Sequence, residues 1–302
     1  MTSNEAIDCI LTVITPVTKL SGELDKLQSW LRSIQDKKIE VWVVHDMADE
    51  ETGNELRNIL SSLHNPHVHL IEEAVGGPGP ARNLGLEKTQ SEWVCFWDAD
   101  DLPDVEEVLL MMDESNAHDE VLIGNFQILD LVRELTLPVT INRDAMYSIG
   151  LNPGLWRMVF RTSSLNGLRF KKIKMGEDQL FLAAYRLASR AKHLHEGIVY
   201  QYTLGRPGQL TKNQSSIDEI ISSVEKLSAI SKDMCGEDLR FVALLLARQV
   251  LTGVKRGSLY IKMKILKFLF INMVLRNPRL GFPVVRTIIK ISLGSLKGFS
   301  NE

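Results

Sequence analysis

The first third of the chain alternates short, almost uninterrupted apolar runs with segments of helical spacing. The apolar runs cover residues 11–15, 39–44, 67–71 and 93–97, and the helical segments cover residues 24–34, 50–63 and 81–88. A strand that is apolar on both faces must be covered on both faces, as in a parallel sheet between two layers of helices. The alternation therefore predicts an α/β fold with a Rossmann-like, mostly parallel sheet and helices on both faces.

The alternation of apolar runs and helical segments becomes less regular after residue 104. It predicts a helix over residues 105–115 and a strand over residues 121–128, followed by mixed segments. Helical spacing returns over residues 175–191, 217–232 and 238–254. A polar stretch near residues 211–216 separates the part that forms the sheet from the helical segments that follow. We therefore predict one domain over residues 1–211 and a helical C-terminal region over residues 212–302.

Composition excludes several classes of protein. Hydrophobic residues make up 44% of the 302 residues and charged residues 24%, as in soluble globular proteins rather than disordered or fibrous ones. Cys9, Cys95 and Cys235 lie far apart, which argues against a disulfide framework or a zinc module and fits a reducing compartment. The start of the chain lacks the pattern of a secretory signal, and no run of about 18 apolar residues predicts a spanning helix. These features favour a cytoplasmic protein.

Charge is distributed unevenly along the chain. The net charge is −3, yet the segment from Lys255 to Glu302 holds ten basic residues and one acid, a net charge of +9. Within it, residues 259–275 are apolar nearly all round, which suits an interfacial helix on the inner, anionic face of the cell membrane. The alternative is a helix docked on the protein or in an oligomer interface. Sparse aromatic residues in this tail and an acidic main part argue against nucleic-acid binding.

Polar residues stand where three of the predicted strands end: Thr15-Pro16, His45-Asp46 and Asp98-Ala99-Asp100-Asp101. In a doubly wound sheet, ligands bind at the carboxyl ends of the strands. Three carboxylates within four residues repel one another unless a cation neutralises them. Carboxylate oxygens suit Mg²⁺ or Mn²⁺ that bridges a diphosphate. The alternative is a solvated turn before a helix.

Other polar residues have both a functional and a structural interpretation. Asp46 would contact a nucleobase or a ribose, or else cap a turn. Arg82 would reach a phosphate or hold a loop, or else lie exposed on its helix. Glu177 and Asp178 stand at the mouth of a predicted helix, where acids favour the helix dipole and where a general base could lie.

The histidine and tryptophan residues are weaker indications of a functional site. His193 and His195 alternate within a predicted strand, which favours packing or surface exposure, and the seven histidines show no spacing typical of zinc ligands. Trp156 would stack on an acceptor sugar or belong to the core.

Several motifs together resemble a known family. The run GGPGPARNLGLEKTQSEWVCFWDADDLPD, residues 76–104, resembles the centre of the family 2 glycosyltransferases of the GT-A fold, with an Ala-Arg-Asn helix, an apolar strand and a DxD motif. LTVITPV, residues 11–17, is similar to the first strand and uridine-contacting loop of that family, and VVHDMADEET, residues 43–52, to its second strand. PGLWRMVFRTSSLNGLRF, residues 153–170, and MGEDQLF, residues 175–181, resemble its acceptor-side segment and its Glu-Asp motif.

The resemblance covers about residues 8–211 and departs from the family at two places. His45, Met47 and Ala48 surround Asp46, where two acids followed by Gly-Ser are usual. YQYTLGRPGQLT, residues 200–211, resembles a flexible loop over the diphosphate, but Gln209 stands where a serine is usual.

The resemblance implies roles for individual residues. Asp100 would ligate the metal, Mn²⁺ or Mg²⁺, that bridges the donor diphosphate, and Asp98 would contact the ribose or share the metal. Asp178, beside Glu177, would take the proton from the acceptor hydroxyl as this attacks the anomeric carbon. The expected donor nucleotide-binding residues are Thr15, Pro16, Val17, Asp46, Arg82, Asp98 and Arg206.

These implications describe a metal-dependent, inverting glycosyltransferase. Its donor would be a nucleotide sugar, expected to be a uridine one, and its acceptor a glycan or lipid-linked glycan in surface polysaccharide biosynthesis. A non-catalytic, glycosyltransferase-like binding subunit is the alternative, because of the departures around Asp46. A DxD phosphohydrolase would have threonine or valine where Leu102 stands, and a sugar nucleotidyltransferase would have a glycine-rich loop near Thr15.

Overall fold

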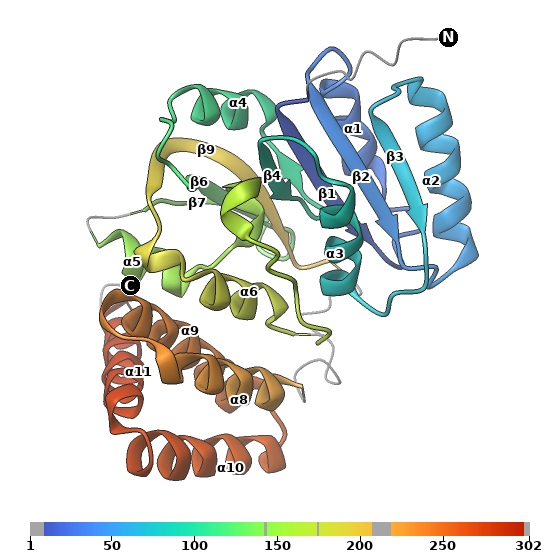
Figure 1. The fold of residues 1–302 in the computed structure, drawn as a ribbon. Helices are drawn as coiled ribbons and strands as arrows, with labels where there is room; N and C mark the ends of the chain where they lie inside the picture. The colour runs from blue at the N-terminus through green and yellow to red at the C-terminus, as the bar shows by residue number, and fades with distance from the viewer. Residues whose placement is uncertain (1–8, 142–143, 174, 207–218, 299–302) are drawn as a thin grey trace. The chain divides into compact units, whose positions relative to one another are not determined.

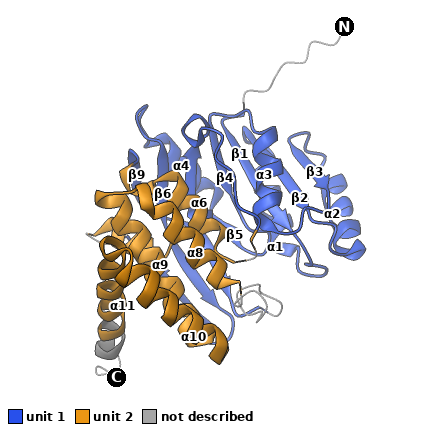
Figure 2. Ribbon diagram, turned by 60° about the horizontal axis from the view of Figure 1, so that its bottom comes forward, with its two compact units in different colours: residues 1–141, 154–172, 190–206 blue, residues 142–153, 173–189, 207–302 orange. Residues whose placement is uncertain are grey.

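The computed structural model describes residues 9–141, 144–173, 175–206 and 219–298 (Figure 1). They form two compact units that are interleaved along the chain (Figure 2). Unit 1 comprises residues 1–141, 154–172 and 190–206, and unit 2 comprises residues 142–153, 173–189 and 207–302. The predicted boundary between residues 211 and 212 lies outside the described residues.

Unit 1 is built on a mixed sheet with the strand order β3-β2-β1-β4-β8-β6-β9-β5, and β7 pairs with β6. The first four strands in this order are parallel neighbours, whereas β8 joins β4 and β6 antiparallel, and β9 runs parallel to β6. The strand bounds are β1 (Leu11–Val17), β2 (Ile39–His45), β3 (Val68–Glu72), β4 (Trp93–Phe96), β5 (Leu102–Pro103), β6 (Val121–Asp130), β7 (Leu135–Val139), β8 (Met158–Arg161) and β9 (Lys192–Leu204).

Helices of unit 1 cover both faces of the parallel part of the sheet. The main helices are α1 (Asp25–Ser33), α2 (Glu50–Leu63), α3 (Pro78–Lys88) and α4 (Val105–Asp113), and two short 3-10 turns are η1 (Leu155–Arg157) and η2 (Thr162–Leu165). Val13 of β1 shares one buried cluster with apolar residues of α1, α2 and α4. Ile14, the next residue, points to the other face and lies against Gly85 of α3. The predicted α/β fold class, a largely parallel sheet with helices on both faces, is confirmed.

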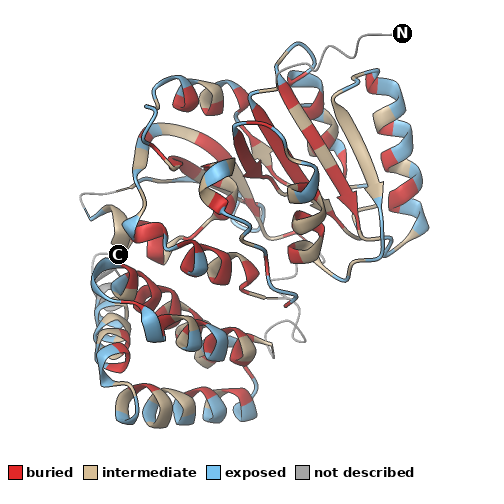
Figure 3. Ribbon diagram, viewed as in Figure 1, coloured by how far each residue is buried: buried red, intermediate tan, exposed pale blue. Residues whose placement is uncertain are grey.

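Burial follows the position of each strand in the sheet (Figure 3). β4 is buried along its whole length, and β1 is buried at every residue but Pro16. β3 stands at the sheet edge and is only partly buried. The apolar runs at residues 11–15 and 93–97 were therefore good predictors of central strands.

The apolar run at residues 11–15 predicts a strand that ends before Pro16. In the structure, β1 instead continues through Pro16 to Val17. Ile14 turns its backbone groups toward β4, since its carbonyl accepts from Trp97 N at 3.2 Å. Pro16, two residues on, faces the same side, where β4 has already ended. Its missing N–H therefore costs no ladder hydrogen bond, and the pairing with β2 goes on.

Unit 2 is helical. Its elements are α5 (Ala145–Leu151), α6 (Glu177–Tyr185), η3 (Leu187–Ser189), α8 (Ile220–Ile230), η5 (Ser231–Asp233), α9 (Gly236–Arg256), α10 (Leu259–Phe268), η6 (Leu269–Leu275) and α11 (Pro278–Gly298). The long helix α9 packs against α5, α6, α8, α10 and α11 and so forms the centre of the unit. Among the described residues, we find no helix with both the length and the apolarity that crossing a bilayer requires.

The helix predicted over residues 175–191 is too long. It ends at Tyr185, because Arg186 adopts a left-handed conformation with φ of 57°. A 3-10 turn follows, and from Lys192 the chain pairs with β6 as strand β9. The left-handed residue and the 3-10 turn therefore end the helix before the last residues of this segment, despite their helical spacing.

Candidate active site

The carboxyl ends of β1, β2 and β4 lie together at one edge of the sheet, since these strands are parallel neighbours. Val17 and Asp46 connect two of these ends through a hydrogen bond from Asp46 N to Val17 O at 2.9 Å. Of the predicted nucleotide-binding segment on β1, Thr15 and Val17 are buried and Pro16 is partly exposed. The Thr15 hydroxyl has no hydrogen-bond partner within the described part of the chain.

Asp46 organises the loop that follows β3. Its Oδ1 accepts hydrogen bonds from Val75 N and Gly76 N, both at 2.7 Å. Gly76 has a φ of +80°, and a Cβ there would lie 3.0 Å from Lys172 Nζ, so the turn favours glycine. The carboxylate therefore holds a loop about 30 residues away, rather than capping a turn at its own position, and it stays partly exposed at the strand end.

Arg82 is buried on α3 and reaches the first acid of the DxD motif. Its guanidinium is 2.8 Å from Asp98 Oδ1 and lies 5.5 Å from the centre of the Phe170 ring. The neighbouring Asn83 exchanges two hydrogen bonds with the Phe170 backbone, at 2.8 Å and 3.0 Å. The exposed-helix interpretation of Arg82 is therefore wrong, because the α3 start is pinned to both Asp98 and residue 170.

Arg206 reaches the second acid of the motif. Its guanidinium lies 2.7 Å from Asp100 Oδ2 and also pairs with Glu23. Lys26 of α1 donates to the Asp100 carbonyl at 3.1 Å, and burial lowers the pKa of its ammonium group. Sequence reasoning missed Glu23 and Lys26, because no local signal connects them with residues about 75 and 180 positions away.

Asp101 differs from its two acidic neighbours, since it is buried and structural. Its Oδ1 accepts from Thr203 N at 2.7 Å, and its Oδ2 accepts from the Tyr200 hydroxyl at 3.2 Å. Burial, together with the charge on Asp98, raises the pKa of Asp101 to about 8. The Tyr200 oxygen in turn accepts from Asp98 N at 3.1 Å. This network connects the end of β9 to residues 98–101, which we call the acidic run.

The three acids are thus neutralised in three ways. Arg82 pairs with Asp98, Arg206 pairs with Asp100, and hydrogen bonds and burial accommodate Asp101. Asp98 and Asp100 remain partly exposed, with 28% and 26% of their side chains accessible. They are the two carboxylates of the run that a metal or a ligand can reach.

Glu177 and Asp178 begin α6 and belong to unit 2. Glu177 is buried, whereas Asp178 is partly exposed and accepts from Gln179 N at 2.7 Å through Oδ1. Gly176 precedes them with a φ of +84°, and a Cβ there would lie 2.5 Å from Ser223 Oγ and Gln249 Nε2. Only glycine fits this entry to the helix, whose N-terminus stabilises the negative charge of both acids.

Trp156 belongs to an aromatic stack in unit 1. Its ring lies 4.5 Å from Tyr200 and 5.6 Å from Tyr202, nearly parallel to both, and Phe126 meets its edge at 4.7 Å. These contacts support its interpretation as a residue packed on the core.

Comparisons with known proteins agree with this fold. The family model described as "Glycosyl transferase family 2" matches residues 12–176. The chain is 29% identical over 229 residues to poly(ribitol-phosphate) beta-N-acetylglucosaminyltransferase TarS of Staphylococcus aureus (strain Mu50), a match that covers 71% of this chain and 38% of that protein. It is 25% identical over 166 residues to succinoglycan biosynthesis protein ExoO of Rhizobium meliloti (strain 1021), covering 48% of this chain and 47% of that protein. The matches thus span less than half the length of these two relatives.

Solved structures show the same architecture. The crystal structure of S. aureus TarS 1–349 in complex with UDP-GlcNAc matches with a TM-score of 0.64 and 20% identity, covering 86% of this chain and 79% of that one. The mannosyltransferase PcManGT from Pyrobaculum calidifontis, in complex with GDP-Man and Mn²⁺, matches with a TM-score of 0.56 and 14% identity, covering 93% and 86%. At these identities, the likeness establishes the fold.

Proposed function

Because the chain belongs to glycosyl transferase family 2, we propose that it is a metal-dependent, inverting enzyme that transfers a sugar from a nucleotide-sugar donor. The observation that carries the proposal is the grouping of Asp46, Asp98 and Asp100 at the carboxyl ends of β2 and β4, where a doubly wound sheet binds its ligands. A uridine donor is favoured by the relative whose structure holds UDP-GlcNAc.

The acceptor in this proposal is a glycan or lipid-linked glycan of a surface polysaccharide. The names of two relatives support this class, since one takes part in succinoglycan biosynthesis and the other acts on poly(ribitol-phosphate). Succinoglycan and poly(ribitol-phosphate) are both polymers.

The donor nucleotide would lie along the ends of β1 and β2. Asp46 uses Oδ1 for the Val75–Gly76 loop, so its Oδ2 is the atom we assign to the uracil or ribose. Pro16 presents the accessible part of the segment from Thr15 to Val17. Arg82 would act through Asp98, because its guanidinium is buried against that carboxylate.

The acidic run fits a divalent metal. Mg²⁺ and Mn²⁺ are commonly held by one or two carboxylates, with substrate phosphates and water completing the coordination. Asp98 and Asp100 supply two accessible carboxylates, and Arg82 and Arg206 limit their mutual repulsion. When bound, such an ion would offset the charge of the leaving nucleoside diphosphate. Arg206 would then exchange its contact with Asp100 for one with the diphosphate.

Asp178 is the general base in this proposal. It would accept the proton of the acceptor hydroxyl while the oxygen forms a bond to the anomeric carbon and the bond to the diphosphate breaks. One displacement of this kind inverts the anomeric centre. Glu177 is buried beside it and would position the start of α6 rather than touch the acceptor.

Nucleotide binding tests the proposal directly. We expect calorimetry to show that UDP binds the purified chain more tightly than CDP or GDP, and that Mn²⁺ tightens UDP binding by at least about tenfold, or 1.4 kcal/mol. Binding without turnover of any UDP-sugar would favour the non-catalytic binding subunit. If none of the nucleotides binds with or without Mn²⁺, the proposed function is wrong.

We also propose that the protein is cytoplasmic and associates peripherally with the inner face of the cell membrane through α10. Two residues of this helix, Ile261 and Ile265, are buried in unit 2. Its other side leaves apolar side chains exposed at helical spacing, and Lys264 and Lys267 are exposed beside them. The exposed apolar residues are Leu259, Tyr260, Met263, Leu266 and, in η6, Phe270. Apolar side chains with adjacent lysines suit an anionic lipid surface.

Vesicle flotation tests this association. Met263→Ser, Leu266→Ser and Phe270→Ser together are expected to weaken binding to phosphatidylglycerol vesicles by about 3 kcal/mol, on the order of 100-fold, because less apolar surface enters the interface. Leu110→Ser is the matched control, since Leu110 is an exposed apolar helix residue of unit 1. Equal flotation of the triple variant and the control would contradict the membrane proposal.

A further inference from the structure

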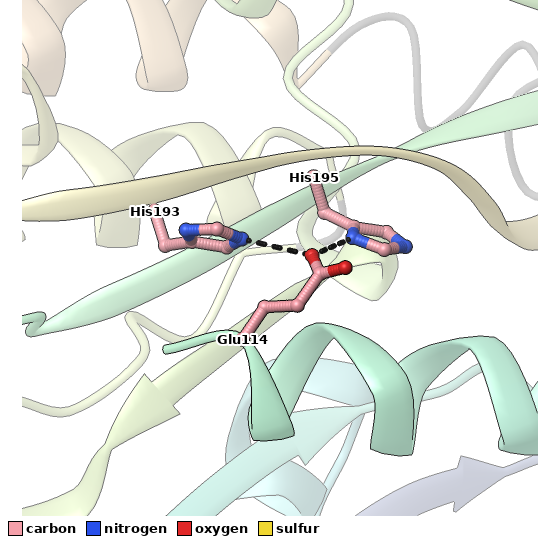
Figure 4. Close-up of side chains that lie close together, drawn as sticks. All are labelled: Glu114, His193 and His195. Atoms are coloured by element: carbon pink, nitrogen blue, oxygen red, sulfur yellow. Dashed lines mark hydrogen bonds and ion pairs between the residues drawn. The ribbon is translucent and has the colours of Figure 1, made fainter. Parts of the chain in front are cut away.

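A cluster of ligand-forming side chains lies at the other end of β9 from the acidic run. His193 and His195 project from the same face of β9, and Glu114 directly follows the last turn of α4, which packs on that strand. All three belong to unit 1. Figure 4 shows a ring nitrogen of each histidine facing the Glu114 carboxylate.

The three side chains converge on one point. Glu114 Oε2 is 2.7 Å from His195 Nδ1 and 3.4 Å from His193 Nε2, and the ligand atoms all lie within 4.8 Å of one another. Ligand atoms of a tetrahedral zinc ion are about 3.3 Å apart, given metal–ligand bonds of about 2.0 Å. The two distances from Glu114 to the histidine nitrogens lie within about 0.6 Å of that value, and the Glu114 side chain is 46% exposed, which leaves it free to move away from His195.

The ring of His195 is held by a second carboxylate from the same helix. Its Nε2 lies 2.8 Å from Glu107 Oε1, and Glu107 precedes Glu114 by two helical turns. Histidines that ligate a metal commonly donate their other ring N–H to a carboxylate in this way, which fixes the ring orientation. Gly197 makes the contact feasible, because a Cβ there would lie 1.7 Å from Glu107 Oε1 and 2.4 Å from His195 Nε2.

We propose that Glu114, His193 and His195 form a binding site for one divalent transition-metal ion, with Zn²⁺ the best match, in which Glu107 orients His195. Two imidazoles and one carboxylate are a donor set that zinc uses in proteins, with water in the fourth position. Partial exposure of Glu114 and His193 leaves room for that water. The ion would connect the end of α4 to β9.

This site is separate from the one proposed for the donor. His195 precedes Thr203, which contacts Asp101, by eight residues, or about 26 Å along an extended strand. Imidazole ligands also favour zinc over Mg²⁺ or Mn²⁺, whereas the two carboxylates at Asp98 and Asp100 favour the hard ions. The zinc site would therefore form whether or not the chain transfers a sugar.

A proton competes with the metal for the same position. Burial of the His195 ring lowers its pKa, but the hydrogen bonds to Glu107 and Glu114 outweigh burial and raise the pKa above its usual value. Metal ligation requires the neutral imidazole, so Zn²⁺ has to compete with a proton for His195 Nδ1.

Zinc binding by the full-length chain tests the site. After chelator treatment, equilibrium dialysis with Zn²⁺ should show one equivalent bound to the wild type and also to Asp100→Asn, which separates this site from the donor acids. Co²⁺ in its place should give the visible absorption of a tetrahedral ion. Glu107→Gln should weaken Zn²⁺ binding by about 10–100-fold, and His193→Ala or Glu114→Gln by more than that.

His69→Ala is the matched control, because His69 also faces a carboxylate, Glu40 at 3.5 Å, on a different strand. It should retain wild-type zinc affinity. Circular dichroism should show that His193→Ala and Glu114→Gln, whose side chains are partly exposed, are folded. Failure of the wild type to bind Zn²⁺, or unchanged binding by these two folded variants, would overturn the proposal and leave His195 as a residue that only connects β9 to Glu107 and Glu114.

Discussion

Asp178→Asn is expected to lower kcat by about 10²–10⁴-fold, the range that a positioned general base contributes. The amide keeps the size of the side chain and can still accept from Gln179 N, as Asp178 Oδ1 does at 2.7 Å. It cannot take the proton of the acceptor hydroxyl. Steady-state kinetics with a UDP-sugar should therefore show the loss in kcat, while calorimetry shows an unchanged Kd for UDP.

Glu225→Gln provides the control for this substitution, since it makes the same chemical change at an exposed acid of unit 2. It should keep both kcat and the UDP affinity of the wild type. Wild-type turnover by Asp178→Asn would remove Asp178 from the mechanism. A loss of UDP affinity as large as the loss of kcat would instead indicate that Asp178 supports the donor site or the fold.

The second large effect is expected for Asp100→Asn. The ratio of the UDP Kd without Mn²⁺ to that with Mn²⁺ should fall from at least about tenfold to near one, because one of two carboxylate ligands is lost. Without Mn²⁺ the variant should bind UDP as well as the wild type or better, since Arg206 loses the carboxylate at 2.7 Å that competes with a diphosphate. Calorimetry in the presence of Mn²⁺ and of a chelator measures both effects.

Asp36→Asn is the matched control for this variant, because Asp36 is an exposed aspartate of unit 1. It should leave the Mn²⁺ effect on UDP binding intact. If Asp100→Asn retains the full Mn²⁺ effect, Asp100 does not ligate the metal, and Asp98 would have to hold it without this neighbour.

The fold was largely predictable because its strongest signals are local. Apolar runs at residues 39–44 and 93–97 became β2 and β4 with bounds shifted by about one residue. The polar residues at their ends, Asp46 and Asp98, were predicted to come together because parallel strands align their carboxyl ends. Each of these inferences needs only the sequence of one strand and a general rule of sheet topology.

The partners of the site residues could not be predicted, because they are distant in sequence. Arg82 is separated from Asp98 by 16 residues, but Arg206, which follows the end of β9, contacts Asp100 more than a hundred residues away. The same limit explains the helix that ends at Tyr185 and the convergence of Glu114 on His195, 81 residues later. The spacing of apolar residues predicts whether a segment is a helix or a strand. It does not predict which strands pair with one another.

The buried position of Asp101 has a consequence for anyone who maps the enzyme by scanning substitutions. Changes at Asp98, Asp100 and Asp101 would all score as loss of activity, and the acidic run would look like a triad with one shared task. Asp101, however, holds Thr203 and Tyr200 in place, so its replacement would displace the strand that carries Arg206 to the site. Loss of thermal stability together with loss of activity would identify this residue as part of the scaffold. Replacement of Asp100 should instead lower activity with little change in Tm, because its partner Arg206 keeps the contact with Glu23.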